Sequence, residues 1–311
     1  AALPALPHAE RIRSYRVTGT GATIIADAAG AAAAARDALE GELKAAALEE
    51  DGITEARGPL TASDPRRTVI AVGSGKGGVG KSTVAANLAI ALARAGRTVG
   101  LIDADVYGPS QTTILGTAAK PAADGEKLVP VAAHGIRFLS LGQLVKPGQA
   151  LAWRGPMATG ALANLLEAEW GDCDTLIVDL PPGTGDVQIS LVQKMKPDGA
   201  VIVSTSQDLS LIDAERAVDL FNRVQVPVLG IVENMAGYIC PHCGGESDPF
   251  GSGGAEAGAK RLHVPFLGRM PLTPAIRQAS DAGTPLAAGT DAEAELFLDL
   301  ARRVAEQVES E

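Results

Sequence analysis

Residues of the types that can bind phosphate and magnesium stand together between positions 73 and 83, in the order Gly73-Ser74-Gly75-Lys76-Gly77-Gly78-Val79-Gly80-Lys81-Ser82-Thr83. Glycines have no Cβ, so the backbone can curl and point its N–H groups at phosphate oxygens. In this spacing Lys81 is expected to reach the β- and γ-phosphates, and Ser82 to offer its hydroxyl to Mg²⁺. A flexible glycine linker would need neither residue. The segment therefore predicts a Walker A loop that binds ATP through Gly75, Lys76, Gly77, Gly78, Val79, Gly80, Lys81, Ser82 and Thr83.

Two acidic segments follow apolar runs that read as buried strands. Asp103 and Asp105 come after Val99-Gly100-Leu101-Ile102, and Asp179 ends Thr175-Leu176-Ile177-Val178. Ligands of open α/β sheets bind at the carboxyl ends of the strands, which is where these acids stand. Asp179 is accordingly predicted to be the Walker B acid, holding Mg²⁺ through a water.

A cysteine pair is the second chemical feature. Cys240-Pro241-His242-Cys243-Gly244-Gly245 has the form of a metal knuckle, in which glycine lets the backbone turn beneath a metal. One chain supplies half of a four-thiolate site, so a two-fold dimer is needed to complete it. Four thiolates suit a [4Fe–4S] cluster or Zn²⁺, and the sequence does not separate the two. A redox-active pair is a third interpretation, although such a pair opens a helix and the two glycines oppose one.

The elements that must position these residues alternate between strand and helix from residue 68 onward. Thr68–Val72 reads as a strand before the loop, and Val84–Gly96 as the helix after it. This pattern predicts an α/β fold, a mostly parallel, doubly wound P-loop NTPase sheet covering residues 67–311. Residues 1–58 read as a separate small α+β domain, and residues 59–66 as a linker.

Composition narrows the class of protein. The 311 residues are 46% hydrophobic and carry a formal net charge of −10, which disfavours a nucleic-acid partner. Three cysteines are too few for a disulfide scaffold and fit a reducing compartment. The sequence shows no signal peptide and no apolar run long enough to span a bilayer, so we expect a cytoplasmic protein with no membrane partner.

The loop resembles the deviant Walker A loop of the MinD, ParA and nitrogenase iron-protein group, because Lys76 follows its first glycine. In that group the extra lysine reaches across a dimer interface to the partner's nucleotide, which implies a catalytic role for Lys76 beside Lys81. The segments after Asp103 and Asp179 resemble switch I and switch II of the group. The resemblance implies that Asp105 orients and polarises the attacking water and that Asp103 lies near Mg²⁺. It also implies that Asn234 contacts adenine, with Pro271 in the segment that flanks the base.

The chain resembles the Mrp/ApbC family of iron–sulfur carrier ATPases. The resemblance rests on the order of these motifs together with Trp153-Arg154-Gly155-Pro156-Met157 and the cysteine knuckle. The resemblance implies a homodimer that binds a [4Fe–4S] cluster at Cys240 and Cys243 and passes it to apo iron–sulfur proteins, with a cluster-assembly scaffold as a further partner. We expect a slow ATPase, since no arginine finger is evident in the sequence. The small domain resembles, weakly, an iron–sulfur assembly domain.

Two other functions compete with the carrier. A MinD- or ParA-like positioning switch would need a basic amphipathic C-terminal helix or a basic patch, whereas residues 291–311 are mostly acidic. An electron donor like the nitrogenase iron protein also bridges a cluster, but its cysteines lie far apart in sequence. The sequence therefore favours the carrier.

Overall fold

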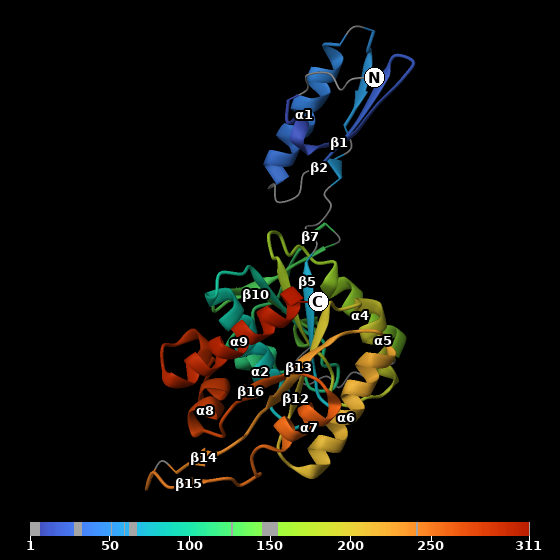
Figure 1. Cartoon of the computed structure of the whole chain (residues 1–311). Helices are drawn as coiled ribbons and strands as arrows, with labels where there is room; N and C mark the ends of the chain where they lie inside the picture. Colours follow the sequence, from blue (N-terminus) through green and yellow to red (C-terminus); the bar gives the residue numbers. More distant parts are fainter. Residues whose placement is uncertain are drawn as a thin grey trace. The chain divides into compact units, whose positions relative to one another are not determined.

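The computed structural model describes residues 7–27, 33–50, 52–58, 60–61, 67–125, 127–144, 155–240 and 242–310. The chain divides into two compact units, Ala1–Arg67 and Thr68–Glu311 (Figure 1). Trp153, Arg154 and Pro241, which belong to the motifs above, lie outside the described residues. No helix among the described residues is both long and apolar enough to cross a bilayer.

The first unit is a small sheet covered by one helix. Its strands are β1 (Ile12–Thr18), β2 (Gly21–Asp27), β3 (Glu55–Arg57) and β4 (Leu60–Thr61), and α1 (Ala33–Leu48) follows β2. A short 3₁₀ turn, η1 (Ala9–Arg11), precedes them. Strand β2 pairs antiparallel with β1 and parallel with β3 and β4. Ile24, Leu39 and Leu43 form the centre of its core. Leu60 and Thr61, which the sequence analysis places in the linker, pair with β2 instead.

The second unit is built on an eight-stranded sheet in the order β16-β13-β12-β5-β11-β6-β10-β9. All neighbours are parallel except β9, which pairs antiparallel with β10. The parallel, doubly wound sheet predicted from the sequence is therefore present. Its strands are β5 (Thr68–Gly73), β6 (Val99–Asp103), β9 (Val131–Ala133), β10 (Ile136–Ser140), β11 (Thr175–Asp179), β12 (Gly199–Ser204), β13 (Val228–Glu233) and β16 (Phe266–Arg269).

Helices cover both faces of this sheet (Figure 1). Along β5, Ile70 and Val72 pack into the core beneath α2 (Lys81–Arg94) and α9 (Ala292–Ser310), while Ala71 faces the opposite core. That second core is closed by α4 (Gly155–Leu166), α5 (Asp186–Met195), α6 (Asp208–Arg223) and α7 (Gly254–Leu262). Successive strand residues point to opposite faces, so a strand buried on both sides must be apolar throughout.

Short elements complete the unit. The two-stranded sheet β14 (Tyr238–Ile239) and β15 (Glu246–Ser247) carries the cysteine pair on its connecting turn, and Figure 1 shows it projecting from the body of the unit. The remaining elements are α3 (Gln111–Ile114), α8 (Pro274–Ala282), β7 (Ala122–Asp124), β8 (Lys127–Val129), η2 (Leu141–Leu144) and η3 (Leu286–Ala288).

Candidate functional site

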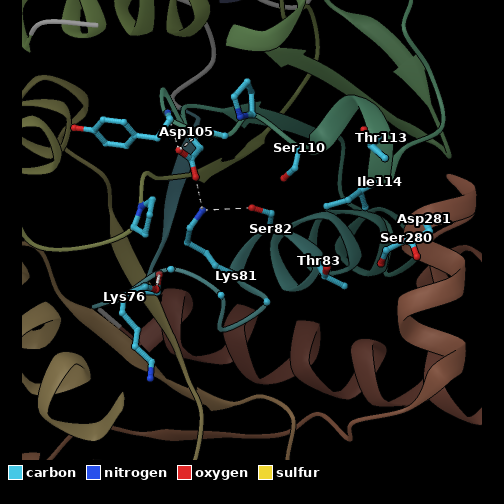
Figure 2. Close-up of a pocket in the computed structure, with 18 residues that line it drawn as sticks. Lys76, Lys81, Ser82, Thr83, Asp105, Ser110, Thr113, Ile114, Ser280 and Asp281 are labelled. Carbon is cyan, nitrogen blue, oxygen red and sulfur yellow. Dashed lines mark hydrogen bonds and ion pairs between the residues drawn. The ribbon is translucent and has the colours of Figure 1, made fainter. Parts of the chain in front are cut away.

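The glycine-rich loop joins β5 to α2 and lines a cavity of about 620 Å³ (Figure 2). Gly78 and Gly80 adopt left-handed backbone conformations, with φ of 80° and 79°, which side chains disfavour. A Cβ on Gly75 would lie 1.9 Å from the Asp213 carbonyl oxygen, so only glycine lets α6 approach this closely. Helix α2 begins at Lys81, and its first N–H groups therefore face the loop, where they favour an anion.

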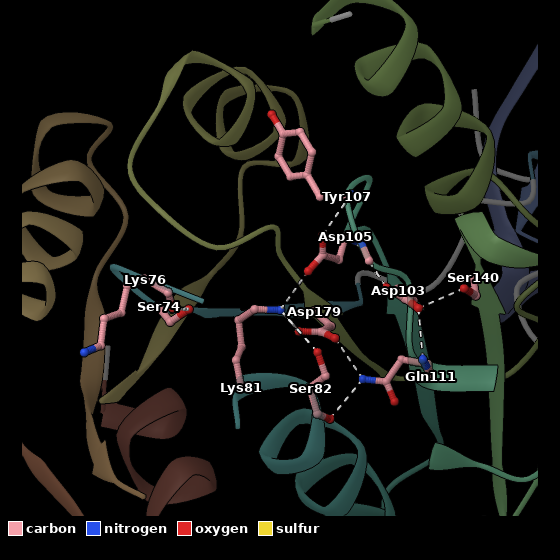
Figure 3. Close-up of polar contacts among 11 residues, drawn as sticks. Ser74, Lys76, Lys81, Ser82, Asp103, Asp105, Tyr107, Gln111, Ser140 and Asp179 are labelled. Carbon is pink, nitrogen blue, oxygen red and sulfur yellow. Dashed lines mark hydrogen bonds and ion pairs between the residues drawn. The ribbon is translucent and has the colours of Figure 1, made fainter. Parts of the chain in front are cut away.

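Lys81 and Asp179 form a buried ion pair at the floor of the site (Figure 3). The Lys81 side chain is 6% exposed and that of Asp179 is fully buried. Lys81 Nζ also lies 3.4 Å from Ser82 Oγ and 3.9 Å from Asp105 Oδ2. The structure thus brings the predicted phosphate-binding lysine together with three of the residues predicted to serve magnesium and the attacking water.

Asp103 is fully buried next to this pair, opposite Asp179 in the register of β6 and β11. Burial and, after it, the charge of Asp179 raise the pKa of Asp103 to about 7, against the lowering by hydrogen bonds from the Gln111 N–H and Ser140 and by the attraction of Lys81. Its Oδ2 accepts bonds from Ser140 Oγ at 2.8 Å and Gln111 N at 3.1 Å, and its Oδ1 one from Asp105 N. The observed role of Asp103 is to fold switch I, and its place near Mg²⁺ stays a prediction.

Asp105 points into the cavity from the start of switch I. Its Oδ1 accepts hydrogen bonds from the N–H groups of Tyr107 (3.0 Å) and Gly108 (3.2 Å), which leaves Oδ2 facing Lys81. Tyr107 is 68% exposed, so it is held outward on a turn that Asp105 folds. A carboxylate in this position can accept a proton or a hydrogen bond from a molecule in the cavity.

Lys76 also lines the cavity but does not join the buried network. It is half-buried, and Figures 2 and 3 show its side chain extending away from Lys81. Its backbone carbonyl accepts a 2.9 Å bond from Ser74 Oγ, and the structure gives its ammonium group no partner among the described residues. The predicted contact with a partner subunit's nucleotide stays a prediction.

Gln111 and Ser140 are parts of the site that the sequence analysis did not identify. Gln111 Nε2 donates to the Ser82 carbonyl oxygen at 3.0 Å and to Asp179 Oδ2 at 2.9 Å. Gln111 directly follows the Gly108-Pro109-Ser110 turn of switch I, and this position in the sequence could have identified it as a residue of the site. Ser140 ends β10, the strand next to β6. A polar residue at the carboxyl end of a parallel strand is where ligands bind, and this could have identified Ser140 as a residue of the site.

Asn234 lies beneath the loop and does not line the cavity. Its Nδ2 donates to the Val79 carbonyl oxygen at 2.8 Å, and a Cβ on Gly80 would lie 2.2 Å from this nitrogen. The amide therefore supports the loop from below. Pro271 does not line the cavity either, and the adenine contacts predicted for both residues stay predictions.

Glu233 anchors the segment that carries Asn234. Its carboxylate accepts bonds from the N–H groups of Gly253 and Ala255 at the start of α7, from Ser206 Oγ at 2.6 Å and from Arg269 Nε at 2.8 Å. Burial raises the pKa of Glu233, but the bonds from Ser206, Ala255 and Arg269 outweigh it and leave the pKa below its ordinary value. A charged carboxylate thus fixes the carboxyl end of β13.

The cysteine pair stands on the turn between β14 and β15. The thiols of Cys240 and Cys243 are free, the first half-exposed and the second exposed. The N–H groups of His242 and Cys243 and the Cys243 thiol donate to Cys240, which lowers the pKa of its thiol. Gly244 closes the turn with φ of 70°, and a Cβ on Gly245 would lie 3.4 Å from Cys243 Sγ. Among the described residues no group of three or more His, Cys, Asp or Glu side chains could hold a metal.

Magnesium fits the oxygen donors next to Lys81, one of which, Ser82, lines the cavity. Ser82 offers a hydroxyl and Asp179 a carboxylate, which are hard oxygen ligands of the kind Mg²⁺ prefers. Lys81 is the group that now covers this carboxylate.

Comparison with known proteins places the chain in a family. Residues 66–306 match the family described as ParA: NUBPL iron-transfer P-loop NTPase. An iron–sulfur cluster carrier protein of Escherichia coli strain K12 is 48% identical over 248 residues, which are 78% of this chain and 67% of that protein. A nucleotide-binding protein of Archaeoglobus fulgidus, solved with ADP and cobalt, is 39% identical with a TM-score of 0.63, covering 72% of this chain and 89% of that one. The cell-division ATPase MinD of Pyrococcus furiosus (22% identical, TM-score 0.57, 77% of this chain and 98% of that one) shares the fold.

Proposed function

The chain belongs to the ParA/NUBPL family of iron-transfer P-loop NTPases, and from this membership we propose that it is an ATP-dependent carrier that holds a [4Fe–4S] cluster between two copies of the chain and transfers it to apo iron–sulfur proteins. The E. coli relative bears the name of such a carrier. The cluster is the cargo of this protein, whereas ATP and Mg²⁺ belong to the P-loop.

The cysteine turn is the observation that carries the proposal. Two free thiols stand on one projecting turn, and N–H groups aimed at Cys240 favour the thiolate that iron requires. Because the turn provides two ligands, a second copy related by a two-fold axis would complete a four-thiolate site. The exposure of Cys243 fits a cargo that must be loaded and released. Zn²⁺ would fit the same four thiolates.

When ATP binds, Lys81 would leave Asp179 and pair with the phosphates instead. Lys81 now neutralises Asp179, and arriving phosphates offer it a stronger anion. Its departure would free Asp179 and Ser82 to hold Mg²⁺, which when bound neutralises charge on the phosphates. Asp105, already fixed by two backbone N–H groups, would orient the attacking water at the edge of the cavity.

Hydrolysis is proposed to be slow within one chain. Among the described residues that line the cavity, Lys76 and Lys81 are the basic ones and none is an arginine. An arginine that reaches the transferring phosphate accelerates related enzymes by about 10³- to 10⁵-fold. A second copy that supplied Lys76 would add a cation, so dimer closure would govern both hydrolysis and the cluster site.

A short stretch of backbone supports communication between the two sites. Asn234 contacts the loop, and six residues later Cys240 begins the cysteine turn. Ala236 N donates to the Met270 carbonyl and Leu272 N to that of Gly237, which braces the stretch against residues 270–272. A shift of the loop at Val79 would therefore be passed on to a braced segment rather than absorbed by a loose one.

A positioning switch on a membrane is not favoured. The apolar side of α9, including Phe297, Leu300 and Val304, is buried in the core it shares with α2. A helix that bound a membrane would keep this side free. The likeness to MinD shows the fold alone.

Cluster transfer to an apo-acceptor, with and without ATP, tests the proposal. The chain is reconstituted anaerobically with iron and sulfide, and its iron, sulfide and zinc contents and its oligomeric state are measured. We expect about one four-iron cluster per dimer and a transfer rate that changes with ATP. A stable zinc-loaded monomer that delivers no iron would contradict the proposal.

A further inference from the structure

Gln111 joins three parts of the nucleotide site that come from distant parts of the sequence. Its side-chain Nε2 bonds the Ser82 carbonyl oxygen and Asp179 Oδ2, and its backbone N–H bonds Asp103 Oδ2 (Figure 3). Gln111 therefore connects three elements: the start of α2, the Walker B strand β11 and switch I. The residue is fully buried.

The orientation of this amide follows from its neighbours. A carbonyl oxygen and a carboxylate oxygen are both acceptors, so the group that faces them must be the NH₂. The amide oxygen, Oε1, then points away from both acceptors and has no hydrogen-bond partner among the described residues. A buried, unpaired acceptor costs free energy that an apolar side chain of similar size would not.

The consequence concerns Asp179, which has two oxygens in two different situations. Oδ2 is held by Gln111, whereas Oδ1 is paired with Lys81, the residue whose partner changes when phosphates bind. If the carboxylate were free to rotate after Lys81 leaves, either oxygen could face the cavity. With Oδ2 bonded to Gln111, only Oδ1 is released, and in a fixed direction.

We propose that Gln111 is a positioning residue for magnesium, one that locks the Walker B carboxylate through Oδ2 so that Oδ1 is presented to the metal's water shell when Lys81 moves to the nucleotide. The inference rests on the proposed nucleotide site and adds a residue to it. Partners that orient a metal-binding carboxylate typically change metal affinity by about 10- to 100-fold when they are removed. This role explains why a buried amide is kept at position 111 although its Oε1 has no hydrogen-bond partner among the described residues.

The test compares nucleotide affinity with and without metal. The affinity for β,γ-imido ATP, a non-hydrolysable analogue, is measured by calorimetry in MgCl₂ and in EDTA for the wild type and for Gln111→Met. A merely structural role would lower both affinities together. We expect the affinity in EDTA to be retained and the gain produced by Mg²⁺ to fall by about 10-fold or more.

Two further variants keep the result interpretable. Gln188→Met is the matched control, because Gln188 is 2% exposed and both polar atoms of its side chain have no partner among the described residues. Its Mg²⁺ gain is expected to equal that of the wild type. Gln111→Asn keeps an amide but withdraws it from Asp179, and its Mg²⁺ gain is expected to fall in the same direction as that of Gln111→Met, which covers the case in which the Met variant does not fold.

Equal losses in MgCl₂ and EDTA, an unchanged Mg²⁺ gain, or a wild type with no Mg²⁺ gain would overturn the inference. Iron content and cluster transfer are measured on the same preparations. A wild type that gains affinity from Mg²⁺ but transfers no cluster would refute the carrier function and leave the role of Gln111 standing.

Discussion

The nucleotide site and the cysteine turn differ in how much of their chemistry one chain completes. Around Lys81 the charged groups are buried, and hydrogen bonds and an ion pair join residues of five strands and helices, α2, α3, β6, β10 and β11. Around Cys240 the thiols are open to solvent on a two-stranded projection. The first region is organised before its ligand arrives, whereas the second offers two thiols, which the proposed function makes half of a site.

This difference has a physical reason. Phosphate binding rewards donors that are fixed in advance, since they need no reorganisation when the anion enters. A cargo site must release what it holds, so ligands split between two copies allow release by separating the copies. The predictions below test this contrast, beginning with the largest expected effect.

Replacing Asp105 by Asn tests the claim that the nucleotide site is organised in advance. The Asn oxygen can still accept the bonds from Tyr107 and Gly108, so the switch I turn is kept while the charge is lost. We expect single-turnover ATP hydrolysis to fall by about 10²-fold or more, with ADP affinity nearly unchanged. Rapid-quench assays with radiolabelled ATP measure the rate. An unchanged rate would remove Asp105 from the reaction.

Replacing Cys240 by Ala tests the claim that the cysteine turn is half of a site. Bound iron after anaerobic reconstitution is expected to fall by about 10-fold or more, since each dimer would lose two of four thiolates. Thermal stability should stay the same because the turn lies outside the core. Cys173→Ala, which removes a buried thiol, is the control and should keep its iron. Full iron content in Cys240→Ala would refute the bridging site.

A pH series on the nucleotide-free chain sharpens the comparison, because Asp103 is a buried acid of the organised region. Its pKa is raised from 3.8 to about 7, so between these values the folded chain holds a proton that the unfolded chain has lost. The stabilising contribution is complete below about pH 4 and disappears as the pH rises through about 7, with a slope of at most about 1.4 kcal/mol per pH unit. Asp103→Asn should flatten this slope in urea-unfolding measurements. Parallel curves for the variant and the wild type would contradict the raised pKa.

The sequence predicted the sheet and the phosphate-binding loop because both depend on local signals. A buried parallel strand must be apolar, and a phosphate-binding loop needs glycines at fixed places, so β11 was predicted at the residues where it is found, Thr175–Asp179. The antiparallel edge strand β9 was not predicted, since three residues carry too little pattern. The strand pair around the cysteine turn was also missed, because each of its strands has two residues.

The side-chain contacts inside the site could not be predicted from local sequence signals. Nothing in the spacing of Gln111 and Asp179 says that their side chains meet, because the sheet order that brings β6 beside β11 is a long-range property. The contact of Asn234 with the base stays a prediction, whereas the bond from its amide to the Val79 carbonyl was not predicted. A side chain with several donors and acceptors fits more than one partner, and packing decides which it meets.

The smallest expected effect concerns the link between the two regions. Asn234→Ala removes the bond to the Val79 carbonyl, and a typical hydrogen bond contributes about 1 kcal/mol, or roughly fivefold in an equilibrium. We therefore expect the effect of ATP on the rate at which an iron chelator strips the cluster to shrink by about fivefold. The rate without nucleotide should not change, because Cys240 and Cys243 are intact.

The control for this link is Asn87→Ala. Asn87 also bonds the backbone beside the nucleotide site, donating to the Thr83 carbonyl, but its other bond is to Ala287 and not to the segment that leads to Cys240. If the two regions communicate through residues 234–240, Asn87→Ala should keep the ATP effect while Asn234→Ala loses most of it. If both variants lose it equally, the coupling runs through α2 or through dimer closure as a whole. In either case the cysteine turn does not respond to the loop through Asn234.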